Sequence, residues 1–348
     1  MKKFVVSTDK PYDILIGRDL LKDAGAYISR CIPSCHFYVI TDSTVNSIYA
    51  QVVMTSLMEH GYRVSKVVFP SGEHSKNLST YSNILEAMAD EGINRSDGIV
   101  ALGGGVVGDM AGFVASTYMR GISYVQIPTT YMAAVDASIG GKTSINLLSG
   151  KNLVGSFWQP SLVLCDYKTF DSLPRTKLAD GIAEAVKCAV VAEDSLISPI
   201  MEHNFEYVIE RCISIKKSVV EVDERDTGLR QILNFGHTIG HGLEKLSAFS
   251  IPHGHAVAKG MVIEARAAYR LGLTDVDISG ELTDIFTKLD FDLSVGYSLE
   301  ELYRFALMDK KISGDKITMV IPESIGKCRL QKISLSELRK FIELGLTP

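Results

Sequence analysis

Residues 97–105 read DGIVALGGG, and the segment VGDMAGFVASTYMRG follows at 107–121. The first segment is a short apolar run that ends in three glycines, which predicts a buried strand leading into a tight turn. The second segment predicts a helix that starts just after the glycines. A strand, a glycine turn and a helix in succession are typical of the βαβ units that build parallel sheets.

The same alternation extends on both sides of this stretch. The apolar and helical patterns predict strands at 35–42, 63–70 and 122–130 and helices at 47–61 and 77–92. After about residue 173 the 3.6-residue periodicity of helices dominates to about residue 308, and 316–323 is the one late strand that we expect. We therefore predict an N-terminal Rossmann-like α/β domain at 1–174 and a mostly helical domain at 175–348.

The bulk composition limits the classes of function. A formal charge of −5 over 348 residues argues against a nucleic-acid partner, because phosphate backbones select basic surfaces. No apolar run is long enough for a membrane span, and the N-terminus lacks the apolar core of a secretory signal. The six cysteines show no disulfide or zinc-knuckle spacing, so a reducing cytoplasm is the expected location.

The glycines at 103–105 suggest an anion site. They let the backbone approach a ligand, and the helix that follows offers unpaired N–H groups and a positive dipole end, which suit a pyrophosphate. The segment is not the G-x-G-x-x-G fingerprint, so a tight turn without any ligand is the alternative interpretation.

Four histidines lie within nineteen residues, in NFGHTIGH (234–241) and IPHGH (251–255). His237 and His241 are four apart and would share one face of a helix, while His253 and His255 are expected in a loop opened by Pro252. Such a cluster suits zinc, and Glu184 in the apolar segment DGIAEAVK is a plausible further ligand. The alternative is a surface Glu184–Lys187 ion pair beside ordinary core histidines.

Lysines gather in the segment SIGGKTSINLLSGKNLVGSFWQP. Lys142 and Lys151 lie there among glycines and small polar residues, and we expect them in loops from which they can reach a ligand. With Lys187, Lys216 and Arg230 they would make an anion pocket. Solvated surface lysine is the alternative for any one of them.

A series of ordered motifs resembles one known family along nearly the whole chain. The motifs are SGEHSK, GGGVVGD, FVASTYMRG, IPTT, DASIGGKT, GKNLVGSFWQP, GIAEAVK, LNFGHTIGH and PHGHAVAKGM. Together they resemble the 3-dehydroquinate synthases. The resemblance implies an NAD-binding α/β domain, a helical metal- and substrate-binding domain, an active site in the cleft between them, and a homodimer.

The resemblance also implies roles for individual residues. Zinc, or cobalt in its place, would be held by Glu184, His237 and His253. The implied NAD contacts are Asp42, Glu73, Lys76, Gly104, Gly105, Val106, Asp109, Thr129, Thr130, Asp136, Lys142, Lys151, Thr169 and Ser172. The implied catalytic and substrate contacts are Arg120, Lys142, Lys151, Asn152, Lys187, Lys216, Arg230, Asn234, His241 and Lys310, with Lys311 as the alternative to Lys310. One departure matters: many relatives have HGEAV where this chain has HGHAV, so His255 could be mistaken for the ligand.

The family's reaction converts 3-deoxy-D-arabino-heptulosonate 7-phosphate into 3-dehydroquinate and phosphate through transient oxidation by NAD, phosphate elimination, re-reduction and aldol closure. Under this hypothesis Lys142, Lys187 and Arg120 hold the phosphate, Lys151 and Arg230 hold the carboxylate, and His241 takes part in proton transfer. The alternatives are another sugar phosphate cyclase, a polyol or iron-type alcohol dehydrogenase, and a non-catalytic phosphosugar sensor. Lys216, Arg230 and Asn234 favour a substrate that carries a carboxylate.

Overall fold

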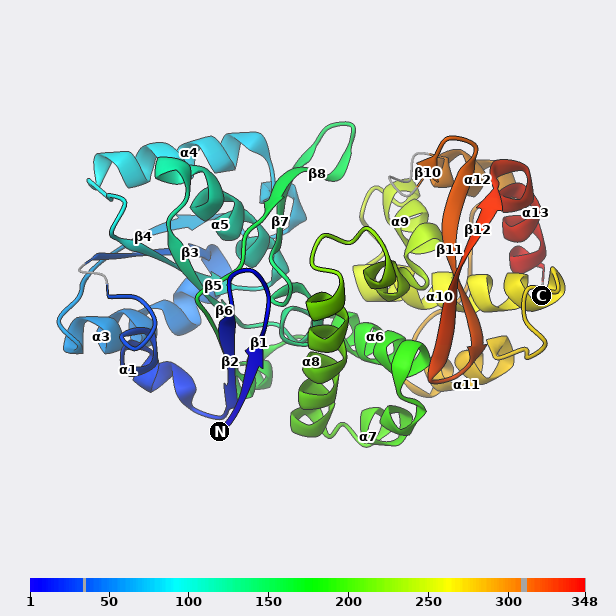
Figure 1. The fold of residues 1–348 in the computed structure, drawn as a ribbon, viewed down its shortest axis with the longest axis horizontal. Coiled ribbons are helices and arrows are strands. Elements are labelled where there is room, and N and C mark those ends of the chain that lie inside the picture. The colour runs from blue at the N-terminus through cyan, green and yellow to red at the C-terminus, as the bar shows by residue number, and fades with distance from the viewer. Residues whose placement is uncertain (34–35, 308–311, 348) are drawn as a thin grey trace. The chain divides into compact units, whose positions relative to one another are not determined.

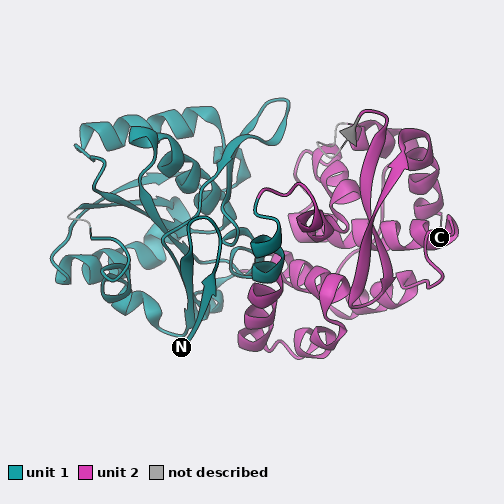
Figure 2. Cartoon of the chain, viewed as in Figure 1, with its two compact units in different colours: residues 1–173, 216–224 teal, residues 174–215, 225–348 magenta. Residues whose placement is uncertain are grey.

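The computed structural model describes residues 1–33, 36–307 and 312–347. The chain forms two compact units, shown in two colours in Figure 2: unit 1 is Met1–Leu173 with Lys216–Glu224, and unit 2 is Pro174–Ile215 with Arg225–Pro348. From the sequence we predicted that residues 216–224 belong to the second domain, at 175–348. In the structure this end of helix α8 (Phe205–Val222) belongs to unit 1, where Lys216 bonds Asp136 and Glu221 accepts a hydrogen bond from the Ser7 amide.

Unit 1 is built on a seven-stranded sheet with the order β1-β2-β9-β6-β5-β3-β4. All neighbouring strands pair in parallel except β1 and β2, which are antiparallel. The strands are β1 (Lys2–Val6), β2 (Tyr12–Gly17), β3 (His36–Asp42), β4 (Arg63–Phe69), β5 (Gly98–Gly103), β6 (Ser123–Pro128) and β9 (Leu162–Asp166). The Rossmann-like prediction is therefore confirmed.

Helices cover both faces of this sheet. Figure 1 shows α1 (Ala24–Ile28) and α3 (Gln51–Glu59) on one face, and α4 (Leu78–Asp90) and α5 (Gly105–Thr117) on the other. The short α2 (Ser43–Val45) follows β3. Each face has its own apolar core, one formed around Phe37, Val100 and Leu162 and the other around Tyr38, Ile99 and Met110. The side chains of β3 and β5 are buried on both faces, which explains their nearly continuous apolar sequence.

The lysine-rich segment is not a loop. It forms an antiparallel hairpin of β7 (Lys142–Leu147) and β8 (Gly150–Phe157), so the prediction of a loop was wrong. Gly155 is required here, because a Cβ atom at this position would lie 2.0 Å from the Thr143 carbonyl oxygen. Lys142 and Lys151 thus project from a paired ribbon whose register is set by backbone hydrogen bonds.

Unit 2 is mostly helical, as predicted. Its helices are α6 (Arg175–Ala192), α7 (Ile197–Met201), the first part of α8, α9 (His237–Leu246), α10 (His253–Arg270), α11 (Ser279–Lys288), α12 (Leu299–Ala306) and α13 (Leu335–Leu346). The helix α10 packs against α6, α9, α11 and α13. None of the helices in the described parts of the chain has both the length and the hydropathy needed to cross a membrane.

The late strand expected at 316–323 is present as β11 (Lys316–Ser324), but it is not alone. It lies between β10 (Ile312–Ser313) and β12 (Lys327–Ser334) in a small antiparallel sheet. The sequence of β12, KCRLQKIS, has no clear apolar alternation because most of its side chains are only half-buried. That weak pattern explains why the strand was missed.

Candidate active site

Three ligating side chains converge in unit 2 from three different helices. Glu184 comes from the middle of α6, His237 from the first turn of α9 and His253 from the first turn of α10. Glu184 Oε1 lies 3.1 Å from His253 Nε2 and 3.5 Å from His237 Nε2. One ligand atom from each residue lies within 4.8 Å of the others, which is the arrangement that a metal ion requires.

Glu184 is wholly buried, and so is its partner Lys187 one turn later on α6. Burial opposes ionisation of the carboxyl, but Lys187 and the two histidines outweigh it and hold the pKa of Glu184 well below its usual value. The alternative of a solvated surface ion pair is therefore wrong. Glu184 is an anion in an apolar helix environment, ready to bind a cation.

The pKa values of the two histidines are shifted in opposite directions, although burial opposes the charge on both rings. Burial lowers the pKa of His237 to about 4, so this ring is neutral and can donate a lone pair. Burial also opposes the charge on His253, but the carboxylates of Glu184 and Glu244 beside its two ring nitrogens raise its pKa to about 10. A metal bound here must displace a proton from His253, so metal binding and proton release are coupled.

His241 lies on the same face of α9 as His237, as the four-residue spacing predicted. Its ring centroid is 5.2 Å from that of His237 and 6.3 Å from that of His253. His241 is more exposed than the three converging residues. It can also form a second potential ligand group with Glu244 and His253.

Close helix packing sets the positions of α9 and α10. A Cβ atom at Gly260 would lie 2.0 Å from the Gly236 carbonyl oxygen, and one at Gly240 would lie 3.1 Å from the Ala256 carbonyl oxygen. Gly236 itself has a positive φ of 77°, which favours glycine. The expectation that Gly236 and Gly240 permit a close approach is confirmed.

Sequence reasoning missed three buried carboxylates that surround the convergent group. Asp180 on α6 accepts a hydrogen bond from the Gly254 amide at 2.8 Å, and Glu264 on α10 accepts one from the Gly236 amide at 2.9 Å. Each thus holds the first turn of a helix that carries a histidine. The third, Glu244, faces His253 Nδ1 at 3.4 Å. Its spacing of three from His241 and seven from His237 was the available signal.

The structure separates His253 from His255. Both lie in the first turn of α10 and not in a loop as expected, with Pro252 as the N-cap residue. His255 points to another side, where its ring packs on Phe291 at a centroid distance of 4.6 Å, and among the described residues it joins neither potential metal group.

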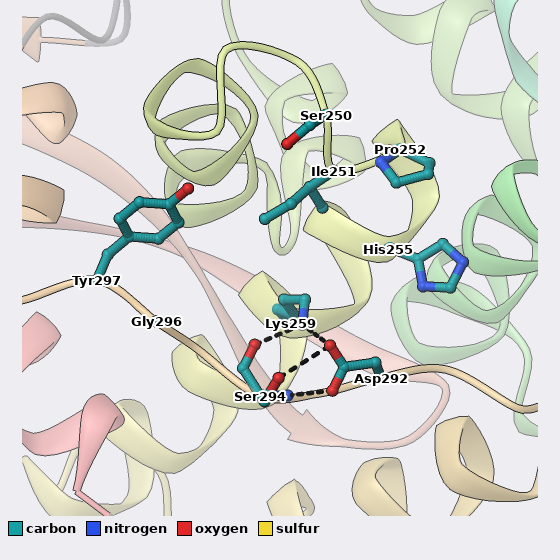
Figure 3. A pocket seen from close by; sticks show the side chains of 9 residues that line it. All are labelled: Ser250, Ile251, Pro252, His255, Lys259, Asp292, Ser294, Gly296 and Tyr297. Atoms are coloured by element: carbon teal, nitrogen blue, oxygen red, sulfur yellow. Dashed lines mark hydrogen bonds and ion pairs between the residues drawn. The ribbon is translucent and has the colours of Figure 1, made fainter.

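His255 instead lines a pocket of about 440 Å³ within unit 2. Figure 3 shows Lys259 there, bonded to the Ser294 carbonyl oxygen at 2.5 Å and to Asp292 Oδ2 at 3.2 Å. None of the site residues predicted from the sequence lines this pocket.

The other predicted residues of unit 2 are placed as follows. Arg230 is almost completely buried, in the short helical segment Leu229–Asn234 that precedes α9. Asn234 lies at the end of that segment and donates to the Gln231 carbonyl oxygen at 3.0 Å. Lys310 and Lys311 lie outside the described residues.

In unit 1 a network joins five predicted residues. Lys76 Nζ lies 2.5 Å from Asp109 Oδ2 and 2.6 Å from Asn152 Oδ1. Lys151 Nζ lies 3.7 Å from Glu73 Oε1. Burial raises the pKa of Asp109, with Lys76 acting in the opposite direction.

Asn146 connects the two parts of this network. Asn146 bonds both Glu73 and the Asn152 amide, and Ser144 donates to Asn152. The hairpin thus brings Lys151 and Asn152 to residues that lie more than forty positions earlier in the chain.

The glycine turn begins at the carboxyl end of β5. Gly104 is the N-cap residue of α5 and supplies no side-chain cap. A Cβ atom would meet Val107 at 2.4 Å if placed on Gly103, and Thr130 at 2.9 Å if placed on Gly104, so packing alone accounts for these two glycines. Gly105 and Val106 form the first turn of a thirteen-residue helix, where backbone N–H groups suit an anion.

The remaining predicted residues of unit 1 lie mainly at strand ends and turns. Thr129 and Thr130 directly follow β6, and Asp42 ends β3, where it caps α2 through the Thr44 and Val45 amides. Thr169 and Ser172 both bond the Tyr49 hydroxyl. Lys216 Nζ bonds Asp136 at 2.7 Å.

Two predicted phosphate contacts also belong to unit 1. Lys142 begins β7 and is half-buried, while Arg120 is exposed after α5 with a left-handed φ of 66°.

Known proteins resemble this chain over almost its full length. Residues 66–180 match the family model 3-dehydroquinate synthase N-terminal, and residues 181–312 match 3-dehydroquinate synthase C-terminal. A 3-dehydroquinate synthase from Streptococcus thermophilus is 42% identical over 357 aligned positions, which cover 99% of this chain and 100% of the relative.

Two solved structures share the fold. A 2-deoxy-scyllo-inosose synthase complexed with carbaglucose-6-phosphate, NAD+ and Co2+ has a TM-score of 0.88 at 27% identity, covering 98% of this chain and 99% of that chain. The 2-epi-5-epi-valiolone synthase of Streptomyces hygroscopicus has a TM-score of 0.86 at 24% identity, covering 96% of each chain. Because both family models and a relative of 42% identity cover this sequence, the chain belongs to the 3-dehydroquinate synthase family.

Proposed function

We propose that this enzyme converts 3-deoxy-D-arabino-heptulosonate 7-phosphate into 3-dehydroquinate and inorganic phosphate. The reaction is redox-neutral overall: the C5 carbinol is oxidised, the C6 proton and the phosphate leave, and C5 is reduced again before ring opening and aldol closure. A site for it needs an electrophilic cation beside C5, a bound nicotinamide, and cationic side chains for the phosphate and carboxylate of the substrate.

The observation that carries the proposal is the convergence of Glu184, His237 and His253 in unit 2. One carboxylate and two imidazoles are a typical zinc donor set that leaves a coordination position for substrate. When bound, zinc supplies positive charge beside the C5 oxygen, and NAD+ supplies a hydride acceptor that is restored in the same cycle. Cobalt fits the same donors and is present in the 27% identical structure.

The chain's cations hold the two anionic ends of the substrate under this proposal. Lys187 shares its carboxylate partner with the proposed metal, so metal binding to Glu184 leaves the Lys187 ammonium available for the substrate phosphate. Lys142 and Arg120 complete the phosphate contacts, and Lys151 and Arg230 bind the carboxylate. Fixing both ends makes the final closure intramolecular, which can lower the barrier by roughly 7–11 kcal/mol at best.

Further side chains would complete the substrate contacts. Asn152, Lys216 and Asn234 bond the hydroxyl and carboxylate groups, and His241 holds or moves a proton near the metal. The Lys310 assignment, with Lys311 as its alternative, is carried over from the family resemblance.

Unit 1 binds NAD under this proposal, and unit 2 binds the metal. The uncapped first turn of α5 at Gly104, Gly105 and Val106 would receive the pyrophosphate, because its N–H groups have no side-chain cap. The other proposed contacts are Asp42, Glu73, Lys76, Asp109, Thr129, Thr130, Asp136, Lys142, Lys151, Thr169 and Ser172. Most of these residues follow the carboxyl ends of parallel strands or belong to the Lys76 network, which is where open α/β sheets bind nucleotides.

The direct test is release of inorganic phosphate from the heptulosonate phosphate by purified protein, with NAD+ and Zn2+ supplied or withheld. Phosphate release that needs both additions, together with 3-dehydroquinate formation and no net NADH, supports the proposal. NADH accumulation without phosphate release would instead identify a polyol or alcohol dehydrogenase. Turnover of a phosphosugar without a carboxylate, in preference to the heptulosonate, would identify a different cyclase.

We further propose a homodimer in the cytoplasm. The exposed position of Arg120, whose backbone is held in a left-handed conformation, fits a side chain that reaches a partner subunit. Sedimentation equilibrium of the purified protein tests the dimer.

A further inference from the structure

The imidazole of His253 lies between two buried carboxylates. Its Nε2 faces Glu184 Oε1 at 3.1 Å, and its Nδ1 faces Glu244 Oε2 at 3.4 Å. The two ring nitrogens are on different sides of the ring, so one imidazole cannot turn toward Glu184 without presenting its other nitrogen to Glu244. Glu244 is 2% exposed, and a buried carboxylate is costly unless it accepts hydrogen bonds.

Helix geometry explains why Glu244 reaches this ring. His237, His241 and Glu244 follow one another at spacings of four and three on α9, so they form a single stripe along that helix. The stripe faces the first turn of α10, where the His237 and His253 ring centroids are 5.5 Å apart. The chain connects the two helices through only six residues, 247–252, which keeps the end of α9 near His253.

The Nδ1 atom of His237 also faces an acceptor oxygen, as His253 Nδ1 faces Glu244. His237 Nδ1 lies 3.1 Å from the Phe235 carbonyl oxygen, so its Nε2 is the nitrogen directed at Glu184. A metal-bound histidine generally donates its second N–H to a carbonyl or carboxylate, which fixes the ring orientation and the tautomer. In this protein the Phe235 carbonyl oxygen is placed to accept a hydrogen bond from His237 Nδ1, and Glu244 is placed to accept one from His253 Nδ1.

A hydrogen bond and close packing against Asp180 also fix the position of the main chain next to His253. The Gly254 amide donates to Asp180 Oδ1 at 2.8 Å, and a Cβ atom on Gly254 would lie 2.5 Å from the Asp180 Cα atom. Asp180 lies four residues before Glu184 on α6. The backbone of His253 is thereby set relative to Glu184, and the rotation of its ring is the remaining freedom.

We propose that Glu244 is a positioning residue that fixes this rotation and keeps the His253 Nε2 lone pair directed at the metal. The inference rests on the metal site of the proposed function. Glu244 touches neither substrate nor the reacting atoms; it acts through His253. It therefore sets the affinity and ligand geometry of the metal.

The test compares Glu244→Gln and Glu244→Ala with the wild type as intact, metal-loaded protein. Zn2+ affinity is measured by competition with a chromophoric chelator, and the ligand geometry by the visible absorption of the Co2+-loaded protein. We expect the Zn2+ dissociation constant to rise by about 10- to 100-fold in Glu244→Ala, with a changed Co2+ spectrum. Glu244→Gln, which still offers an acceptor oxygen, should recover part of the affinity, which a purely structural role would not predict.

Glu210→Gln is the matched control. It neutralises a buried carboxylate of unit 2 that belongs to neither potential metal group among the described residues, so its affinity and spectrum should match the wild type. A Glu244→Ala protein with unchanged Zn2+ affinity and an unchanged Co2+ spectrum would overturn the inference.

The number of metal ions per chain separates the remaining outcomes. If the wild type binds two Zn2+ ions and Glu244→Ala loses only one, Glu244 is itself a ligand with His241 and His253, and the positioning role is wrong. Glu184→Ala is measured in parallel. Wild-type affinity in that variant would contradict the metal site itself, whatever Glu244 does.

Discussion

Lys187 and Glu184 form an ion pair one turn apart on α6, with their side chains 2% and 1% exposed. Both charges are removed from water, so the Glu184 carboxylate depends on Lys187, on His237 and His253, or on a bound cation. A bound cation can replace Lys187 as the partner of Glu184, and a bound phosphate can replace Glu184 as the partner of Lys187. Under the proposed function, the pair would therefore link metal binding with substrate binding.

Replacing Lys187 by methionine should separate these two roles. The apolar side chain fits the buried position, so we expect Lys187→Met to keep its zinc but release phosphate on the order of 100-fold more slowly or worse, for lack of a cation at the phosphate. Without metal the variant should be less stable than the wild type, because Glu184 then keeps only His237 and His253 to offset its buried charge. Phosphate release and urea unfolding with and without a chelator give these quantities, and the exposed Lys327→Met is the control. Wild-type turnover in Lys187→Met would contradict the phosphate role.

Removing the ligands should remove the metal. Glu184→Ala and His253→Ala each leave two of the three proposed donors, and we expect purified protein of either variant to contain almost no zinc. Metal content by mass spectrometry is the measurement, and a chelator followed by zinc restoration should abolish and recover phosphate release in the wild type. Normal zinc content in both variants would refute the ligand set.

The buried neutral His237 predicts acid sensitivity of the metal-free protein. Burial lowers its pKa to about 4, below the unfolded value of about 6.5. Between these values the unfolded chain binds more protons, so His237 loses folded-state stability as the pH falls from about 6.5 to about 4, by at most about 3 kcal/mol. His253 has a raised folded pKa of about 10, so its contribution is complete below its unfolded pKa and is lost only as the pH rises toward 10. Urea unfolding across the acid range should show a shallower loss for His237→Asn than for the wild type; parallel curves would count against this assignment.

Lys76 should matter for the cofactor. Its ammonium bonds both Asp109 and Asn152, so Lys76→Met would leave the half-buried carboxylate of Asp109 without this cation. We expect weaker NAD+ binding, by about tenfold or more, with zinc content unchanged. Calorimetric titration with NAD+ measures the effect. The exposed Lys66→Met, on β4 of the same unit, is the control; equal affinities in all three proteins would exclude Lys76 from the NAD+ site.

Arg120 provides a test of subunit sharing. Its side chain is exposed, so Arg120→Ala should fold normally while losing most of its activity if the guanidinium binds phosphate. If Arg120 acts on the partner subunit, mixing and refolding Arg120→Ala with Lys187→Ala should produce some sites with both cations intact. Recovered phosphate release in the mixture is the expected result, and a mixture as inactive as its parents would mean that each subunit uses its own Arg120.

Local patterns predicted the buried strands β3, β5 and β6, although the equally buried β9 was not predicted. The segments 98–103 and 36–42 are almost wholly buried, so their apolar runs were unambiguous. The hairpin β7–β8 and the strand β12 were not recognised, because half-buried antiparallel strands carry polar residues and depend on pairing with a distant partner. The assignment of 216–224 failed for a related reason: continuous helical periodicity cannot show which compact unit the end of a helix joins.

By itself the sequence determined the fold class, the family and the types of residue available for chemistry, because these depend on periodicity and on ordered motifs. It left open whether His253 or His255 faces Glu184, and it did not reveal Asp180, Glu244 or Glu264 as partners. Only the tertiary structure decided these points. Helix α6 must pack against α9 and α10, which lie more than forty positions later in the chain, before the His253 ring nitrogen can face Glu184. The direction of a side chain in a first helical turn follows from that packing and not from local spacing.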